Sequence, residues 1–266
     1  MLGINDRTKN VLAEIAGHFQ PTQMPVRDHH GDGGYNNHGF HGASFEDRGD
    51  VNIALIGDES IEGVGIEVTK VASSILEQKL YEVSGQRVRC WNLGWSGKSA
   101  DYLKLMTEAA IKHLSPNIVL LVFPDFLRWE YFMENGEVID FIPERSMEIV
   151  EKRVNAKRLE RKIHSHLLEI SSPYQGCVNF MTNYSACALM LDGCGINWAF
   201  SASDTRLHRE WMPDILKNPL IDENRYIGHM MPTLSKCDKS CVDNQLIFAN
   251  NFTKWLTKEP SLVRIK

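Results

Sequence analysis

Four acidic side chains follow the ends of predicted strands. Asp58, Glu59 and Glu62 come after the first apolar run of the chain, and Asp125 comes after the third. Because the carboxyl ends of parallel strands meet at one edge of a sheet, these carboxylates are candidates for a single cluster. Clustered carboxylates share protons or bind a hard cation such as Mg²⁺ or Ca²⁺. The simpler interpretation, that Glu59 and Glu62 suit the dipole of a helix's first turn, is favoured, and we predict no metal.

Histidines and cysteines offer other candidate ligands, but their spacing matches no compact site. Cys237 and Cys241 are the one close pair among six cysteines, and no second pair accompanies them as a zinc site would require. Residues 20–50 hold several histidines, prolines and glycines but few core-forming residues. This segment is typical of an irregular loop that wraps a domain.

Apolar runs alternate with amphipathic stretches along the rest of the chain, which predicts a parallel sheet covered by helices. Between the third strand and the next helix, an aromatic segment at 126–143 is interpreted as a lid or a small hairpin at the rim of the site. We expect an N-terminal helix and wrapping segment at 1–50, one α/β domain at 51–257 and a tail at 258–266. The expected strands are 51–56, 88–93, 117–123 and 195–201, and the expected helices are 66–83, 99–114, 144–170, 177–193 and 242–256.

Composition excludes several classes of partner. The formal charge is -5 and the pI is about 6.1, so no general attraction to nucleic acid or to an anionic membrane is implied. No apolar run approaches the roughly 20 residues that cross a bilayer, and the N-terminus carries no recognisable signal peptide. We therefore expect a cytoplasmic or otherwise soluble protein. The glycines after residue 56 fit neither a P-loop nor a dinucleotide fingerprint, so no cofactor is predicted.

Several motifs, taken in order, resemble the blocks of the SGNH (GDSL-type) hydrolases. Gly57-Asp58-x-x-x-x-Gly63-x-Gly65 is similar to the first block, and Asn92-Leu-Gly-Trp-Ser-Gly97 to the second. The run 115–123 is placed like the strand before the third block. The segment 36–42 is similar to a lead-in of many members, and Asp238 with the following helix is similar to the last block.

This resemblance implies a three-layer α/β/α sandwich with a mostly parallel sheet (SGNH or flavodoxin-like) and an irregular N-terminal extension. It also implies an esterase with a serine nucleophile, a histidine base and an aspartate. The nucleophile position holds Glu59, and Ser60 is one residue later. Asp125 stands near the expected oxyanion asparagine, and Cys241 stands at the expected histidine.

Three hypotheses remain open. A divergent esterase would use Ser60 as nucleophile, His229 as base and Asp238 as its orienter, with the amides of Ser60 and Gly97 as oxyanion donors. Its pocket would include Asn92 and the acids Asp58, Glu59 and Asp125, and its substrate would be a small-molecule or carbohydrate ester, for example an O-acetyl sugar. A catalytically inactive relative would instead bind a partner, with residues 1–50 or 126–143 facing a protein. Carboxylate-based chemistry at the strand ends is the third.

Overall fold

The central sheet is parallel and has five strands. The computed structural model describes residues 34–132, 138–151, 158–203, 207–230 and 242–258 of the 266-residue chain. The strands are β1 (Val51–Gly57), β2 (Val88–Gly94), β3 (Ile118–Phe123), β6 (Asn197–Ala202) and β7 (Tyr226–His229), in the order β2-β1-β3-β6-β7. Taken in chain order this is the flavodoxin-like 2-1-3-4-5 arrangement, whose ligand crevice lies beyond the ends of β1 and β3.

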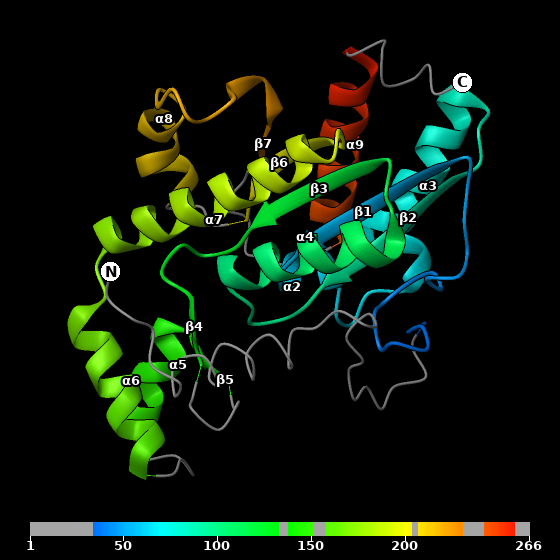
Figure 1. The fold of residues 1–266 in the computed structure, drawn as a ribbon. Coiled ribbons are helices and arrows are strands. Elements are labelled where there is room, and N and C mark those ends of the chain that lie inside the picture. Colours follow the sequence, from blue (N-terminus) through cyan, green and yellow to red (C-terminus); the bar gives the residue numbers. More distant parts are fainter. Residues whose placement is uncertain (1–33, 133–137, 152–157, 204–206, 231–241, 259–266) are drawn as a thin grey trace, which may run out of the picture.

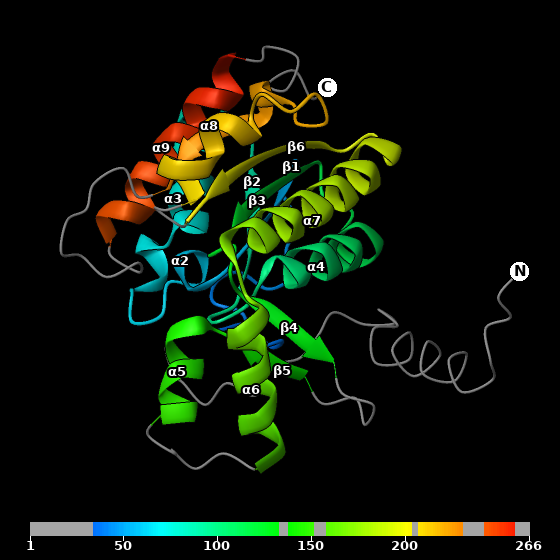
Figure 2. The same ribbon diagram turned by 90° about the vertical axis from the view of Figure 1, so that its left-hand side faces the viewer.

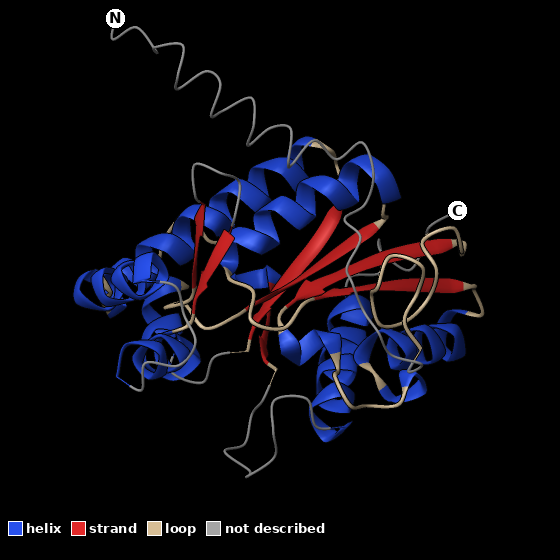
Figure 3. Ribbon diagram, turned by 90° about the horizontal axis from the view of Figure 1, so that it is seen from below, coloured by secondary structure: helices blue, strands red, loops and turns tan. Residues whose placement is uncertain are grey.

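Helices cover both faces of this sheet. On one face lie α3 (Ala72–Ser84) and α9 (Val242–Lys258), which pack against each other. On the other face lie α4 (Ala100–Leu114) and α7 (Pro173–Gly193), which form a second packed pair. The view from below in Figure 3 shows the strands between the two helical layers, as does Figure 1. The predicted three-layer α/β/α class is confirmed.

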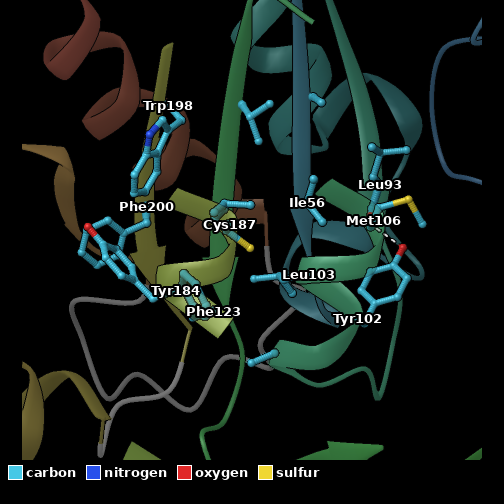
Figure 4. Packing of buried hydrophobic residues seen from close by; sticks show 14 of the residues in the cluster. Ile56, Leu93, Tyr102, Leu103, Met106, Phe123, Tyr184, Cys187, Trp198 and Phe200 are labelled. Atoms are coloured by element: carbon cyan, nitrogen blue, oxygen red, sulfur yellow. Dashed lines mark hydrogen bonds between the residues drawn. The ribbon is translucent and has the colours of Figure 1, made fainter. Parts of the chain in front are cut away.

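The two cores follow the period-2 alternation of the strands. Ile53 and Leu55 of β1 face α3 and α9, whereas Ala54 and Ile56 face α4 and α7. On β3 every side chain is buried, as the continuous apolar run predicts. Figure 4 shows the α4–α7 side, where Ile56, Phe123 and Phe200 from the strands meet helix residues such as Leu103 and Tyr184.

A smaller unit lies beside the sheet. The strands β4 (Trp129–Phe132) and β5 (Val138–Phe141) pair antiparallel, and α5 (Pro143–Glu151) and α6 (Arg158–Ile170) lie next to them (Figure 2). The expectation of one long helix over 144–170 is wrong, because α5 and α6 pack side by side instead of continuing along one axis. The pairing buries Ile149 and Leu167, which a single exposed helix would leave in water.

Two further expectations need correction. The helix expected over 66–83 is instead a 3-10 turn η1 (Val68–Lys70) followed by α3, because Val71 between them is extended. A short helix α2 (Glu59–Glu62) precedes them and ends at Gly63, which adopts a left-handed conformation. The sequence pattern predicts no element between residues 201 and 242, yet this stretch contains the η2 turn (Leu207–Trp211), α8 (Met212–Ile215), η3 (Glu223–Arg225) and β7. Within the described part of the chain, none of the helices combines the length and the apolar character needed to cross a bilayer.

Candidate functional site

The turn after β1 is built around Asp58. This residue is fully buried and caps α2, because its Oδ1 accepts hydrogen bonds from the Ser60 amide at 2.9 Å and the Ser60 hydroxyl at 2.5 Å. Its Oδ2 accepts a hydrogen bond of 3.0 Å from the hydroxyl of Ser203, the residue just after β6. Gly57 must be glycine here, because a Cβ would lie 2.5 Å from the Ile61 side chain. The turn is therefore fixed by bonds between the ends of β1 and β6.

Glu59, the residue at the expected nucleophile position, is held by an arginine. Both oxygens of its carboxylate accept from the Arg128 guanidinium at 2.7 Å, in the bidentate geometry that makes such pairs strong. Arg128 also approaches Asp58 at 3.5 Å and is 8% exposed. Burial opposes its charge, but Glu59, Asp58 and Asp125 outweigh burial and raise the pKa of Arg128. The guanidinium therefore lies where a cation bound by these acids would lie.

The second-block loop donates its amides to the same acids. The amide of Gly97, the expected oxyanion donor, donates to Glu59 Oε2 at 3.2 Å. The amide of Ser96 donates to Glu62 Oε2 at 2.6 Å, and Glu62 is itself buried. Asn92 ties the loop to α2, because its side-chain nitrogen donates to the Ile61 carbonyl at 2.8 Å. The Glu59 carboxylate thus lies in front of the Gly97 amide, the donor that the motif resemblance assigns to an oxyanion hole.

Asp125 has a turn-forming role. It is 7% exposed, and its Oδ1 accepts the Leu127 amide at 2.9 Å while its carbonyl accepts the Arg128 amide at 3.0 Å. These bonds turn the chain after β3 so that Arg128 faces α2. Among the described residues, no group of three or more His, Cys, Asp and Glu is arranged to hold a metal ion. The four acids of the sequence cluster are therefore engaged by amides, hydroxyls and one guanidinium.

The predicted catalytic residues are brought together only in part. Ser60 is fully buried; its hydroxyl donates to Asp58, and its carbonyl accepts from Gln245 of α9 at 2.6 Å. His229 is buried at the end of β7, in register with Ala202, so it lies at the same end of the sheet as Ser60. Asp238 lies outside the described residues. The Ser60, His229 and Asp238 triad stays a prediction.

Three residues of this site were missed by the sequence reasoning. Arg128, Ser203 and Gln245 bind the first-block turn from positions 69 to 185 residues away. Only Arg128 gave a usable signal, because acids expected at one sheet edge need a cation nearby, and it is a basic residue just after the third strand.

A second ion cluster ties the β4–β5 hairpin to the second-block loop. Lys98 lies 2.9 Å from Asp140 and 3.6 Å from Glu130, and its ammonium stands over the Trp95 ring. Burial raises the pKa of Glu130 to about 7, although Lys98 lowers it. Lys98 and Asp140 thus hold the hairpin against the loop that carries Gly97, beside a buried carboxyl whose pKa is raised.

No protein-family model matches the chain, and no curated protein matches it. Solved structures do show similarity. A psychrotrophic esterase from Pseudoalteromonas sp. is 11% identical at a TM-score of 0.48, with 79% of this chain and 98% of the other covered. An acetylxylan esterase from Geobacillus stearothermophilus, solved as a catalytic mutant, is 11% identical at a TM-score of 0.45, with coverage of 77% and 93%.

A third structure carries the family description that the sequence motifs resemble. It is a putative lipolytic protein of the G-D-S-L family from Desulfitobacterium hafniense, 12% identical at a TM-score of 0.44, with 77% of this chain and 99% of the other covered. At such identities and TM-scores these similarities say nothing about the chemistry of this chain. The chain has the flavodoxin-like α/β/α fold that its SGNH-like motifs implied, and Glu59, which stands where that resemblance expects a nucleophile, is paired with Arg128.

Proposed function

We propose that this chain is a non-hydrolytic protein on an SGNH-like scaffold, and that it acts by binding a partner molecule. The observation that carries the proposal is that the Glu59 carboxylate accepts a hydrogen bond from the Gly97 amide while Arg128 holds the carboxylate in place. In a serine esterase that amide is free to stabilise the oxyanion that forms in the transition state. Here the amide already binds a permanent anion of the chain itself, the Glu59 carboxylate.

Electrostatics shows why this arrangement disfavours ester hydrolysis. An oxyanion that formed near Gly97 would meet the Glu59 carboxylate. Two like charges 4 Å apart repel by about 4 kcal/mol at an effective dielectric constant near 20, which corresponds to roughly a thousandfold in rate. Arg128 offsets part of this repulsion, but its two short hydrogen bonds are already made to Glu59.

The state of Ser60 supports the same proposal. A nucleophilic hydroxyl must reach the substrate and must give its proton to a base within hydrogen-bond distance, about 3 Å. Ser60 is fully buried, and its hydroxyl donates to the capping residue Asp58. Asp58 is held in place as the cap of α2 by the Ser60 amide, so the acceptor of the Ser60 hydroxyl has a fixed position.

The alternative is the divergent esterase, acting on a small-molecule or carbohydrate ester. One observation favours it: His229 ends β7 beside β6, and Ser203 just after β6 is bonded to Asp58. His229 and the turn that carries Ser60 therefore lie at the same end of the sheet, beyond the carboxyl ends of its strands. For Ser60 to act, the Glu59–Arg128 pair would have to open and the hydroxyl would have to leave Asp58.

A fluorophosphonate probe, which labels activated serines covalently, tests the proposal. The purified chain is treated beside a known serine esterase, and aryl acetate hydrolysis is followed in parallel. We expect no labelling and no hydrolysis above background in the wild type. Labelling that is lost in Ser60→Ala and His229→Ala, but kept in the remote control Ser171→Ala, would establish the esterase and overturn the proposal.

The partner surface is a prediction that rests on the hairpin. Tyr131 and Val138, on β4 and β5, are both exposed although they are large and apolar. Exposed apolar side chains on a hairpin that packs beside the candidate site are suited to a protein contact. Residues 1–33, the greater part of the other predicted partner-facing segment, lie outside the described residues.

A further inference from the structure

A shallow apolar groove lies at the end of the sheet opposite to the candidate site. It is lined by the first residue of each of three neighbouring strands, Val51 of β1, Val88 of β2 and Ile118 of β3. The candidate site lies beyond the carboxyl ends of these strands, so the groove at their amino ends shares no residue with it. A role for the groove is therefore independent of the Glu59–Arg128 pair.

Two helix ends form the sides of the groove. The C-terminal end of α3 contributes Leu80, Val83 and Ser84. The last turn of α9 contributes Leu256 and Thr257. None of the residues that line the groove is charged, and most of them are aliphatic. The groove is therefore suited to apolar side chains and offers no group that would select an ion.

The size of the groove narrows the choice of occupant. Its free volume is about 30 Å³, far below the roughly 300–1,000 Å³ of small-molecule sites. A space of this size takes the tip of one aliphatic side chain. Such a space also provides little of the roughly 800 Å² that each partner of a stable dimer buries. A single side chain from a short segment therefore fits better than a ligand or a second copy.

The mouth of the groove carries apolar surface that is still in contact with water. Val83 is 58% exposed, whereas Leu80 and Leu256 in the same groove are 8% and 4% exposed. Burial of an exposed aliphatic side chain is favourable, because it removes apolar surface from water. A segment that covers Val83 would thus complete the core between α3 and α9.

The chain leaves α9 directly at this groove. Lys258 is the last residue of α9 and follows Leu256 and Thr257, which line the groove. Residues 259–266 come next and lie outside the described residues. Pro260 has no amide hydrogen, and its ring disfavours a helical backbone in the residue before it. The sequence therefore predicts that the chain leaves the axis of α9 within a few residues of the groove.

The segment 259–266 supplies the apolar side chains that the groove lacks. Leu262, Val263 and Ile265 are aliphatic and fall within four consecutive positions. Leu262 lies five residues beyond Thr257 and so stays within about 17 Å of it even in an extended chain. As the first aliphatic residue after Pro260, Leu262 also closes the shortest loop when it docks.

We propose that residues 259–266 fold back over this groove and insert the Leu262 side chain between the ends of α3 and α9. The docked segment covers Val83 and holds α9 against α3. At the other end of α9, Gln245 binds the Ser60 carbonyl and the Ala72 amide. The segment therefore supports, from the opposite end, the helix that fixes the turn after β1.

Thermal unfolding tests the tail side of this contact. The full chain is compared with a chain that ends at Lys258 and with the full-length variant Leu262→Asp. Both changes should lower the melting temperature by a similar amount, about 3–8 °C, because both remove the same buried side chain from the groove. Ser261→Asp, which adds the same charge one residue earlier, is the matched control and should change the melting temperature by less than about 1 °C.

Val83→Lys tests the groove side. Lysine is a better helix former than valine, and a cation suits the last turn of a helix, so this substitution alone should not destabilise α3. In the full chain it should lower the melting temperature as much as loss of the segment does, and in the shortened chain it should lower it no further. Tyr81→Lys is the control, since Tyr81 is 59% exposed on α3 and lies outside the groove.

Three results would overturn the proposal. The first is an unchanged melting temperature after removal of residues 259–266, and the second is an equal loss from Val83→Lys in both chains. The third is a dimer in light scattering that Val83→Lys dissociates, which would assign the groove to a second copy. If the shortened chain does not fold, the double variant of Leu262→Asp and Val83→Lys in the full chain provides the same comparison.

Discussion

Replacement of Arg128 by methionine isolates the ion pair at the centre of the candidate site. The side chain keeps most of its length but loses the guanidinium. Two bonds of 2.7 Å to Glu59 are lost, and so is the 3.5 Å contact to the fully buried Asp58. The two acids are then left together without their cation.

The magnitude follows from burial. Removal of one partner of a buried ion pair costs about 3–5 kcal/mol, because the remaining charge is not compensated. Asp58 is wholly buried, but the Glu59 side chain is 22% exposed and can regain some water. We therefore expect the lower part of this range, about 3–4 kcal/mol of unfolding free energy. Glu59→Gln removes charge without creating an orphan, because Arg128 keeps Asp58, and should cost about 1–2 kcal/mol.

Urea unfolding followed by tryptophan fluorescence measures these free energies. In the double variant, the loss should be less than the sum of the single losses, because Glu59→Gln removes one of the two charges that Arg128→Met leaves behind. Lys217→Met is the control, since its exposed pair with Asp214 should contribute less than about 1 kcal/mol. The reasoning is refuted if Arg128→Met costs less than about 1 kcal/mol, or if Glu59→Gln costs as much as Arg128→Met.

Three further predictions concern the surroundings of the site. Burial raises the pKa of Glu130 from 4.5 to about 7, so between these pH values the folded state keeps a proton that the unfolded state has lost. The resulting stabilisation is complete below pH 4.5 and is lost as the pH rises through 7. In urea titrations at several pH values, the unfolding free energy of the wild type should therefore fall by about 2–4 kcal/mol across this window relative to that of Glu130→Gln. Equal pH slopes would contradict this. Gln245→Leu removes both bonds that tie α9 to the α3 start and to the turn after β1, and should cost about 2–4 kcal/mol by urea unfolding, whereas Thr253→Ala should cost below about 1 kcal/mol. Gly94→Ala places a Cβ 2.3 Å from the α2 backbone, so its melting temperature should fall by more than about 5 °C, whereas Gly193→Ala, with open space around it, should change little; similar melting temperatures would show that α2 can move.

Much of the sheet could be predicted because its strands are buried on both faces and therefore appear in the sequence as continuous apolar runs. The run that became β3 is apolar throughout, and each of the first three strands is followed by an amphipathic helix or a turn. The strand β7 could not be found in this way. It has four residues, one of them Gly228, and its partner β6 lies more than 20 residues earlier. Its pairing is a tertiary effect, which local pattern does not encode.

The same distinction applies to the site. The rule that the carboxyl ends of parallel strands meet correctly brought Asp58, Glu59 and Asp125 together, since all three act on the charge of Arg128. The second-block resemblance added Gly97, whose amide reaches Glu59. Neither could tell that the carboxylate of Glu59 would turn toward the Gly97 amide, nor that Gln245 would reach the Ser60 carbonyl from 185 residues away. Such contacts depend on side-chain direction across layers, and sequence spacing within one element carries no information about it.

Glu59, which stands where the motif resemblance expects a nucleophile, and Arg128 after β3 are best understood as one feature. A carboxylate there without a cation would lie against the buried Asp58, and the repulsion would destabilise the turn. A guanidinium without Glu59 would keep only its longer contact to Asp58. Each charge therefore requires the other. The substitution Glu59→Ser would supply a hydroxyl, but it would leave Arg128 facing Asp58 and would remove the acceptor of the Gly97 amide. The change that would introduce the nucleophile of an esterase would therefore destabilise this turn.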